Sequence, residues 1–229
     1  MSVIASNLQA VLARIANACR LAGRAPESVG LLAVSKTWPT DGVLAAAAAG
    51  QRVFGESYAQ EALTKMTSTR GLGLEWHFIG PLQSNKTRAV AEHFAWVHSI
   101  DRAKLAERLS AQRPAGLPPL QVCVQVNVSN EASKSGCRPE EALALCRAVV
   151  AQPNLSLRGL MTIPQPTDNV AAQRAAFGRL RQLREDLRQT AGFELDTLSM
   201  GMSDDLEAAV AEGATIVRVG TAIFGERTP

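Results

Sequence analysis

Short apolar runs alternate along the chain with segments in which apolar residues recur at helical spacing. Eight runs of strand-forming residues occupy 30–35, 52–55, 76–80, 95–100, 120–128, 157–161, 196–200 and 215–219. Helical spacing predicts helices over 40–49, 58–68, 84–93, 102–113, 139–151, 168–191 and 203–212, and one more near the N-terminus. Strands that alternate with helices in this way predict a parallel sheet with helical crossovers.

The number of strands points to a closed barrel. Eight strand and helix units in 229 residues, preceded by one helix, predict an α/β fold with a single (β/α)8 TIM barrel and an extra N-terminal helix. We expect one domain over residues 1–229. A doubly wound open sheet is the alternative, but it needs a glycine-rich turn after the first strand. The stretch "VSKTWP" (34–39) contains no glycine.

Composition and charge exclude several partners. The formal net charge is only +3 and no basic run stands out, so we expect neither nucleic acid nor a membrane surface as a partner. The longest apolar stretch, 42–50, is too short to span a bilayer, and the N-terminus lacks the pattern of a secretory signal. Cys19, Cys123, Cys137 and Cys146 form no CxxC pair and no metal-binding spacing. We interpret them as buried, reduced thiols of a cytoplasmic protein without a metal site.

A lysine ends the first predicted strand. Lys36 shares the parity of Leu32 and Val34, so it continues the row of side chains that points into the barrel. Side chains at the carboxyl ends of barrel strands line the active face, and a desolvated lysine is a nucleophile toward carbonyl groups. The local pattern alone is more typical of a lysine that extends to solvent at a strand end.

The loops after the last two predicted strands have the composition of a phosphate site. Such loops, with a short extra helix, commonly bind phosphate in these barrels. The candidate ligands in 198–209 and 217–226 are Ser199, Ser203, Gly220 and Thr221. Asp204 and Asp205 would repel an anion and are instead typical of a helix start.

Arg218 lies within the last strand, between two valines. An arginine there either points outward, forms a buried ion pair, or donates to a ring nitrogen or an anion inside the barrel. A strand-end lysine, a phosphate site and an inward arginine together suggest a phosphorylated carbonyl compound. Pyridoxal 5'-phosphate has the aldehyde, the phosphate and the ring nitrogen for these three groups.

Eight ordered motifs resemble one known family, the YggS/PROSC family of pyridoxal phosphate homeostasis proteins. They are "AVSKT" (33–37), "FGESYAQEA" (54–62), "WHFIGPLQSNK" (76–86), "HSIDR" (98–102), "VNVSNEASKSG" (127–136), "GLMTI" (159–163), "SMGMSDD" (199–205) and "VRVGTAIFG" (217–225). The resemblance runs from about residue 8 to 226. It implies a fold-type III barrel similar to the N-terminal domain of bacterial alanine racemase.

The resemblance also implies the roles of individual residues. Lys36 matches the lysine that forms the Schiff base, and Arg218 matches the arginine that faces the pyridine nitrogen. The remaining matches are Ser203, Gly220 and Thr221 for the phosphate, Met161 and Ser199 along the cofactor, and Lys134 as a second lysine linked to cofactor handling. We interpret His77 and His98 as hydrogen-bonded polar residues near the site, not as acid–base groups. Ser57 departs from the family, which usually has asparagine there, and its shorter side chain offers one hydroxyl in place of the amide group's two donors and one acceptor.

Three functions compete on these residues. The favoured one is a non-catalytic, monomeric protein that buffers pyridoxal phosphate and delivers it to apo-enzymes. An amino-acid racemase would need a second acid–base group opposite Lys36, and the only tyrosine is Tyr58. An aldolase would need an acid near Lys36, for which Glu56 is a candidate. Because Arg218 can only donate, it would keep the ring nitrogen unprotonated and the ring a poor electron sink. We therefore expect no catalytic residue.

Overall fold

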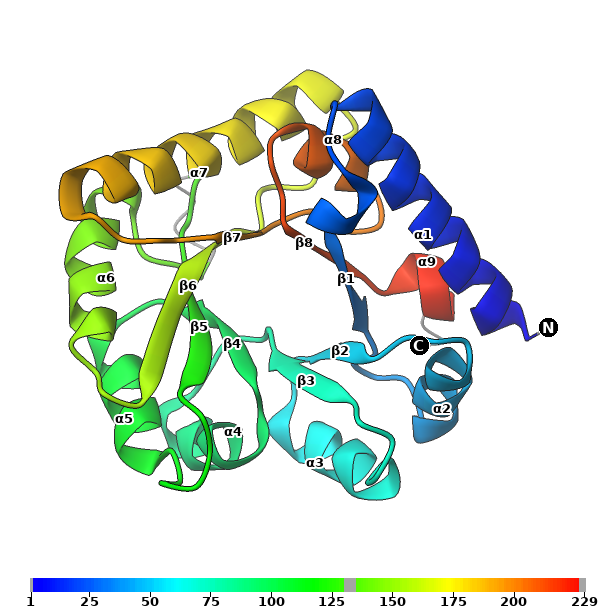
Figure 1. Cartoon of the computed structure of the whole chain (residues 1–229), viewed down its shortest axis with the longest axis horizontal. Coiled ribbons are helices and arrows are strands. Elements are labelled where there is room, and N and C mark those ends of the chain that lie inside the picture. The colour runs from blue at the N-terminus through cyan, green and yellow to red at the C-terminus, as the bar shows by residue number, and fades with distance from the viewer. Residues whose placement is uncertain (1, 130–134, 227–229) are drawn as a thin grey trace.

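The protein is a closed barrel of eight parallel strands. A computed structural model describes residues 2–129 and 135–226, and its strands follow one another around the barrel in chain order (Figure 1). The strands are β1 Gly30–Val34, β2 Val53–Glu56, β3 Glu75–Phe78, β4 Trp96–Ile100, β5 Leu120–Gln125, β6 Leu155–Met161, β7 Thr197–Ser199 and β8 Ile216–Val219. Every strand falls on one of the apolar runs, and the predicted barrel is confirmed.

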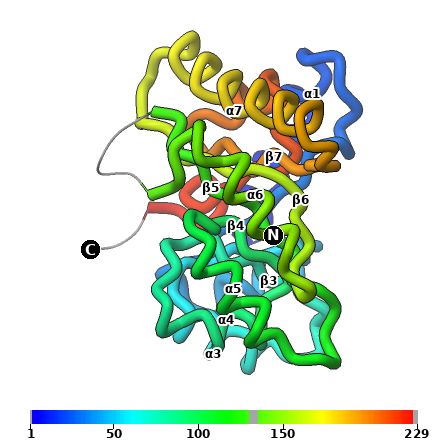
Figure 2. Tube along the Cα trace, turned by 90° about the vertical axis from the view of Figure 1, so that its left-hand side faces the viewer, coloured from blue at the N-terminus to red at the C-terminus, as the bar shows by residue number. Residues whose placement is uncertain are grey.

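A ring of helices surrounds the strands (Figure 1). The helices are α1 Val3–Leu21, α2 Thr40–Ala48, α3 Ala59–Ser68, α4 Thr87–His93, α5 Ala103–Gln112, α6 Ala142–Val150, α7 Val170–Ala191, α8 Leu206–Ala211 and α9 Thr221–Phe224. Short 3-10 turns occupy Pro26–Ser28, Ser84–Lys86 and Pro139–Glu141. The side view shows α7 and α1 along one flank of the barrel and α3, α4 and α5 along the opposite flank (Figure 2).

The extra N-terminal helix packs against the end of the chain. Its N-cap is Ser2, whose side chain accepts a hydrogen bond from the backbone N–H of Ala5 at 3.2 Å. Leu8, Val11 and Ile15 recur at helical spacing and are buried. Through this face, α1 contacts α8 and α9, the two helices that follow the last two strands.

Apolar side chains form two separate layers. A small cluster of Leu32, Val34 and Ile79 lies inside the barrel, whereas Ala33 belongs to the large core between the strands and the helices. This alternation follows from the period of two along a strand. Arg218 is the register partner of Leu32, and register partners point to the same side of a sheet. The arginine therefore points into the barrel.

The four cysteines are buried and unpaired. Burial raises the pKa of Cys137 and of Cys146 to about 12, so both thiols stay protonated at neutral pH. The interpretation of the cysteines as buried thiols is confirmed. Within residues 2–129 and 135–226, no helix is long and apolar enough to cross a membrane, and no group of three or more His, Cys, Asp or Glu side chains could hold a metal ion.

Candidate functional site

A cavity of about 180 Å³ lies at the carboxyl ends of the strands. Its wall consists of Val34, Lys36, Ser57, Ile79, Ile163, Met202, Ser203, Asp204, Arg218, Gly220 and Thr221. Five of the seven predicted site residues thus meet at one place: Lys36, Ser203, Arg218, Gly220 and Thr221. They come from both ends of the chain because β1 and β8 are neighbours in the closed barrel.

The other two predicted site residues lie deeper. Met161 and Ser199 are register partners at the ends of β6 and β7, and both are fully buried. Neither belongs to the cavity wall, which Ile163 and Met202 reach instead. The ends of the predicted strands correctly indicated the region of the barrel that holds the site. How deep a side chain lies in the barrel depends, in addition, on how far its strand extends compared with the neighbouring strands.

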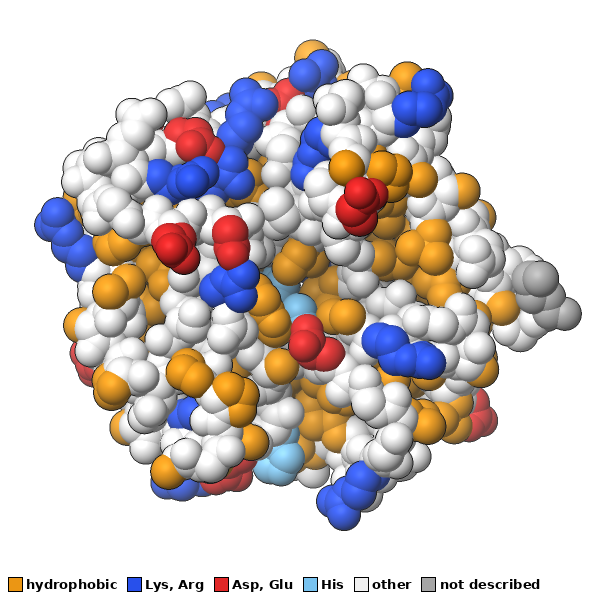
Figure 3. Space-filling view, viewed as in Figure 1, with side chains coloured by type: hydrophobic (Ala, Val, Ile, Leu, Met, Phe, Trp, Pro, Cys, Tyr) orange, Lys and Arg blue, Asp and Glu red, His pale blue; other side chains and the backbone are white. Residues whose placement is uncertain are grey.

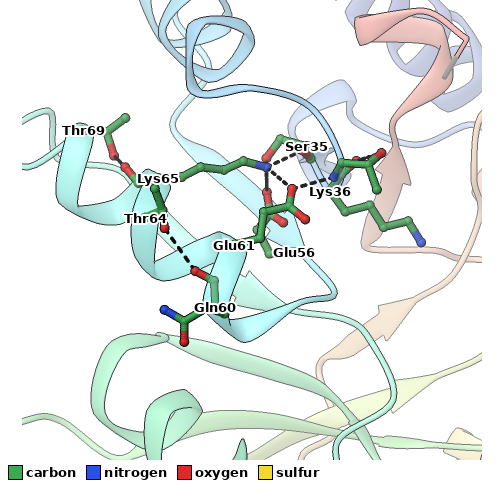
Figure 4. Close-up of polar contacts among 9 residues, drawn as sticks. Ser35, Lys36, Glu56, Gln60, Glu61, Thr64, Lys65 and Thr69 are labelled. Carbon is green, nitrogen blue, oxygen red and sulfur yellow. Dashed lines mark hydrogen bonds and ion pairs between the residues drawn. The ribbon is translucent and has the colours of Figure 1, made fainter. Parts of the chain in front are cut away.

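A buried charged cluster holds the backbone on both sides of Lys36 (Figure 4). Lys65, on α3, is 3% exposed, and its ammonium group donates to the carbonyl oxygen of Ser35 at 2.6 Å. The same ammonium group contacts Oε1 of Glu56 at 2.7 Å and Oε1 of Glu61 at 2.6 Å. The sequence did not predict this role, because Lys65 resembles any lysine on an amphipathic helix.

The residue after Lys36 is held by the same cluster. Glu61 Oε1 accepts a hydrogen bond from the backbone N–H of Thr37 at 2.6 Å. Thr37 has a φ of 67°, in the left-handed region that non-glycine residues rarely adopt. The turn at Thr37 lies between Lys36 and the following helix, α2. Figure 4 shows the Lys36 side chain extending away from the cluster. Its side chain lines the cavity.

Glu56 is part of the cluster and is not one of the residues that line the cavity. Its Oε1 accepts from the Ser35 hydroxyl at 2.7 Å and from Lys65, while its Oε2 is buried without a partner among the described residues. Burial raises the pKa of Glu56, against the opposing effect of hydrogen bonds from Lys65 and Ser35. Since Glu56 does not line the cavity wall, it is poorly placed to act as an acid on a molecule bound there.

Arg218 forms part of the cavity wall, although it is only 3% exposed. Its guanidinium donates to the hydroxyl of Ser199 at 2.8 Å and to the carbonyl oxygen of Thr162 at 2.9 Å. Burial lowers its pKa to about 10, which leaves it protonated at neutral pH. Among the described residues no carboxylate forms an ion pair with it, so the outward and ion-paired alternatives are both wrong.

Two buried histidines continue this network away from the cavity. His98 Nδ1 lies 2.7 Å from Ser199 Oγ, and His98 Nε2 lies 2.9 Å from His77 Nδ1. His77 Nε2 in turn lies 2.8 Å from a carboxylate oxygen of Glu75. The interpretation of both histidines as hydrogen-bonded polar residues is confirmed. The sequence did not single out Glu75, which starts β3 and looks like an ordinary exposed strand end.

The opposite end of the cavity is built by the loops before α8 and α9. The Ser203 hydroxyl accepts a hydrogen bond from the backbone N–H of Ala222, in the first turn of α9, at 3.4 Å. Arg14 on α1 donates to the Ser203 carbonyl oxygen at 2.9 Å and pairs with Glu207. Asp204 also belongs to the wall, so one carboxylate lies among the donors at this end.

A second, larger pocket of about 520 Å³ adjoins the cavity and shares Lys36 and Ser57 with it. Tyr58 lines this pocket and not the cavity, and its side chain is 57% exposed. Gly80 passes close to Ser57, since a Cβ at Gly80 would lie 2.5 Å from the Ser57 carbonyl oxygen. Lys134, the predicted second lysine, lies outside the described residues.

Comparison with known proteins gives a consistent result along the whole chain. The family model described as "Alanine racemase, N-terminal domain" matches residues 6–228. A protein of Pseudomonas aeruginosa named "Pyridoxal phosphate homeostasis protein" is 65% identical over 227 residues, which cover 99% of this chain and 97% of that protein. A protein of the same name from Escherichia coli K12 is 52% identical over 232 residues, with 99% and 98% covered.

Solved structures agree with these sequences. PipY of Synechococcus elongatus PCC7942, solved with PLP (pyridoxal phosphate) bound, superposes with a TM-score of 0.83 at 39% identity and covers 97% of this chain and 100% of its own. An alanine racemase of Clostridium difficile superposes with a TM-score of 0.75 at 14% identity over 98% of this chain and 58% of its own. The racemase comparison supports the fold alone.

Proposed function

The chain belongs to the family of pyridoxal phosphate homeostasis proteins, and from this premise we propose that it binds pyridoxal 5'-phosphate in the cavity beside Lys36. Its function is then to buffer the cofactor and deliver it to apo-enzymes, without robust catalysis of its own. The relative from Synechococcus elongatus, solved with PLP bound, supports the cofactor.

The chemistry of the cavity wall fits the three polar parts of this cofactor. Lys36 offers an amine for the aldehyde, and Arg218 offers N–H donors for the ring nitrogen. Ser203 and Thr221 offer hydroxyl groups for the phosphate, and Gly220 leaves room for a close approach. When bound, the cofactor supplies an aldehyde for amines and a conjugated ring that can accept electrons.

The observation that carries the non-catalytic part of the proposal is the environment of Arg218. A guanidinium can donate hydrogen bonds but cannot accept them. Its buried position and its two protein partners fix it in one orientation on the cavity wall. A ring nitrogen facing Arg218 therefore receives a hydrogen bond and stays unprotonated, which makes the ring a weak acceptor of electrons.

The two catalytic alternatives lack a suitably placed group among the described residues. Racemisation needs a second acid–base group across the ligand from Lys36, and Tyr58 lines the adjoining pocket and not the cavity. The aldolase alternative depends on Glu56, which is committed to Ser35 and Lys65. We therefore propose that Lys36 holds the cofactor and that no residue of the site acts as a catalyst.

Covalent trapping tests the binding site. Borohydride reduction of the purified protein with pyridoxal 5'-phosphate should attach one equivalent to the peptide that contains Lys36, as read by mass spectrometry. Lys36→Ala should abolish this adduct, and Lys86→Ala, which changes a lysine of the adjoining pocket, should retain it. An adduct found mainly on Lys86 or Lys134 would show that the assignment of Lys36 is wrong.

Proton exchange tests the absence of catalysis. With L-alanine in heavy water, the loaded wild-type protein should exchange no more than traces of the α-proton and should not produce D-alanine. NMR and chiral chromatography measure the two outcomes. Racemisation at about 1 per second or faster, an ordinary enzyme turnover, would overturn the non-catalytic proposal.

We also propose that the chain acts as a single domain over residues 1–229 and as a cytoplasmic monomer. The closed barrel uses strands from β1 to β8 and leaves no strand edge for a second chain. The low net charge and the absence of a basic run support a small-molecule partner over nucleic acid or a membrane surface. Light scattering at several concentrations tests the monomer, and a dimeric mass would contradict it.

A further inference from the structure

A continuous chain of hydrogen bonds crosses the inside of the barrel from one end to the other. It begins at Glu75, whose carboxylate is 49% exposed at the amino end of β3. It ends at Arg218 on the cavity wall. The space-filling view shows one end of the barrel with a histidine at the bottom of a central hollow and acidic and basic side chains around it (Figure 3). Between the two ends stand His77, His98 and Ser199.

The chemistry of the two ends fixes every proton between them. Glu75 as a carboxylate can only accept, so His77 must donate through Nε2. A neutral His77 then accepts at Nδ1, which requires that His98 donate through Nε2. A neutral His98 accepts at Nδ1 from the Ser199 hydroxyl.

The hydrogen bond between Arg218 and Ser199 has the same donor-to-acceptor direction as the others. Arg218 has only donors, so its guanidinium donates to the Ser199 oxygen, which has a free lone pair. Each donor in the chain therefore points away from the cavity and toward Glu75. Hydrogen bonds aligned in one direction polarise each other in a low-dielectric interior.

We propose that Glu75, His77, His98 and Ser199 are positioning residues for Arg218. Through their hydrogen bonds they connect the buried guanidinium to the carboxylate at the far end of the barrel. This connection holds the remaining N–H groups of Arg218 toward the ring nitrogen of the bound ligand. The part that concerns the ligand rests on the proposed binding of pyridoxal 5'-phosphate. Glu75 is thus linked to the guanidinium through three neutral side chains. Asp205 is the carboxylate whose charge raises the pKa of Arg218 against the effect of burial, although the two form no direct ion pair among the described residues.

The surroundings of the histidines favour their neutral forms. Burial lowers the pKa of His77 and, with His77 and Arg218 nearby, lowers the pKa of His98 well below its usual value. The hydrogen bond from His77 lowers the pKa of Glu75, which keeps that carboxylate charged. Trp96 stacks on His77 with ring centroids 5.2 Å apart, and the guanidinium of Arg158 lies 5.3 Å from the Trp96 ring centroid.

Nitrogen NMR of the ligand-free protein tests the direction of the chain without any ligand. Both His77 and His98 should appear as neutral rings protonated at Nε2 at neutral pH, with the imidazole nitrogens assigned through His77→Gln and His98→Gln. A proton on Nδ1 of either ring, or a charged ring, would overturn the proposed chain. This measurement decides whether the chain exists even if the protein fails to bind pyridoxal phosphate.

Binding of two ligands that differ only at the ring nitrogen tests whether Ser199 acts, through Arg218, on that nitrogen. Ser199→Ala should lower the affinity for pyridoxal 5'-phosphate about tenfold, the effect of one hydrogen bond in a charged network. The same variant should hardly change the affinity for the carbon analogue in which a C–H group replaces the ring nitrogen. Ser110→Ala is the matched control, since Ser110 is a buried, hydrogen-bonded serine on α5 outside the chain.

The outcomes of the binding experiment separate the two proposals. Equal losses for both ligands would show that Ser199 supports the fold and does not act through the ring nitrogen, which overturns the positioning role. Failure of the wild-type protein to bind either ligand would overturn the proposed function, and the tautomers seen by NMR would still test the hydrogen-bond chain on its own. Circular dichroism of each variant establishes that it is folded before binding is measured.

Discussion

At the scale of single residues, the backbone around Lys36 is held by side chains that do not line the cavity. Lys65 and Glu61 bond to the peptide groups on either side of Lys36, at the Ser35 carbonyl and the Thr37 N–H. A lysine side chain has four rotatable bonds and loses considerable entropy when it is ordered. The fixed backbone before and after Lys36, with Thr37 in the left-handed region, reduces the number of positions that the amine of Lys36 can take.

Replacement of Lys65 by methionine should destabilise the protein strongly. Lys65 and Glu56 are 3% and 0% exposed, and removal of one partner of a buried ion pair costs about 3–5 kcal/mol. Urea unfolding should show this loss for Lys65→Met, whereas Lys104→Met, at an exposed site on α5, should change stability by less than about 0.5 kcal/mol.

A double variant checks the physical cause. Lys65→Met combined with Glu56→Gln should recover part of the lost stability, because the fully buried carboxylate is then replaced by a neutral amide. Glu61 also loses its partner, but its side chain is 29% exposed and can be solvated. If Lys65→Met alone unfolds at the same urea concentration as Lys104→Met, Lys65 is not the buried counter-ion of Glu56. If the double variant is simply the sum of the two single ones, their charges do not interact.

Ser203 should discriminate between phosphorylated and unphosphorylated ligands. Its hydroxyl lies on the cavity wall beside the first turn of α9, where we propose that the phosphate binds. Ser203→Ala removes one hydrogen bond to a charged group, worth about 1.5–3 kcal/mol, and should weaken pyridoxal 5'-phosphate binding roughly ten- to a hundredfold. Binding of pyridoxal, measured by fluorescence titration, should hardly change. Equal weakening of both ligands would mean that Ser203 supports the loop and not the phosphate.

At the scale of elements, local patterns predicted the barrel and five of the eleven residues of the cavity wall. Apolar runs located all eight strands, and Gly220 with Thr221 located the start of α9. The Lys65 cluster and the histidine chain could not be predicted, because each joins side chains from several strands or helices. Their contacts depend on register, such as Ser199 meeting both His98 on β4 and Arg218 on β8. Register also explains why Met161 and Ser199 lie deeper than their strand-end positions suggest.

Gly220 connects β8 to α9 and should not tolerate a side chain. It precedes α9, and a Cβ there would lie 3.0 Å from the Val34 carbonyl oxygen and 3.4 Å from the Val34 Cβ. Because a strand carbonyl can move little, Gly220→Ala should cost about 1–3 kcal/mol in stability and weaken retention of the phosphorylated ligand. Gly116→Ala is the control, since a Cβ at Gly116 meets no atom within 4 Å. Thermal unfolding and ligand titration of both variants measure the effects, and equal behaviour would exclude the steric cause.

At the scale of the whole molecule, the barrel interior connects two chemically different ends. One end holds the cavity with Lys36 and Arg218, and the other holds the exposed carboxylate of Glu75. The interior between them is polar along one path, through His77, His98 and Ser199, and apolar at Leu32, Val34 and Ile79. A polar path with every group bonded is compatible with a stable core, but only while both histidines remain neutral.

The stability of the protein should therefore fall in mild acid. The pKa of His98 lies well below its usual value in the folded protein, and the pKa of His77 is also lowered. Between these folded values and about 6.5 the unfolded chain binds more protons, so the free energy of unfolding decreases as pH falls. From pH 7.5 to 5.5, each histidine that stays neutral when folded should cost about 1.4 kcal/mol. Guanidinium unfolding at several pH values measures the slope.

Comparison of variants separates this effect from other titrating groups. Burial raises the pKa of Glu56, so its stabilising contribution is complete below about 4.5 and is lost as pH rises, opposite to that of the histidines. His98→Gln should therefore flatten the acid slope relative to the wild-type protein, even if the variant is less stable at every pH. His93→Gln changes an exposed histidine on α4 and should keep the wild-type slope. If His98→Gln also keeps the wild-type slope, protonation of His98 does not limit the stability of the protein in acid. The hydrogen-bond chain from Arg218 to Glu75 then does not depend on neutral histidines.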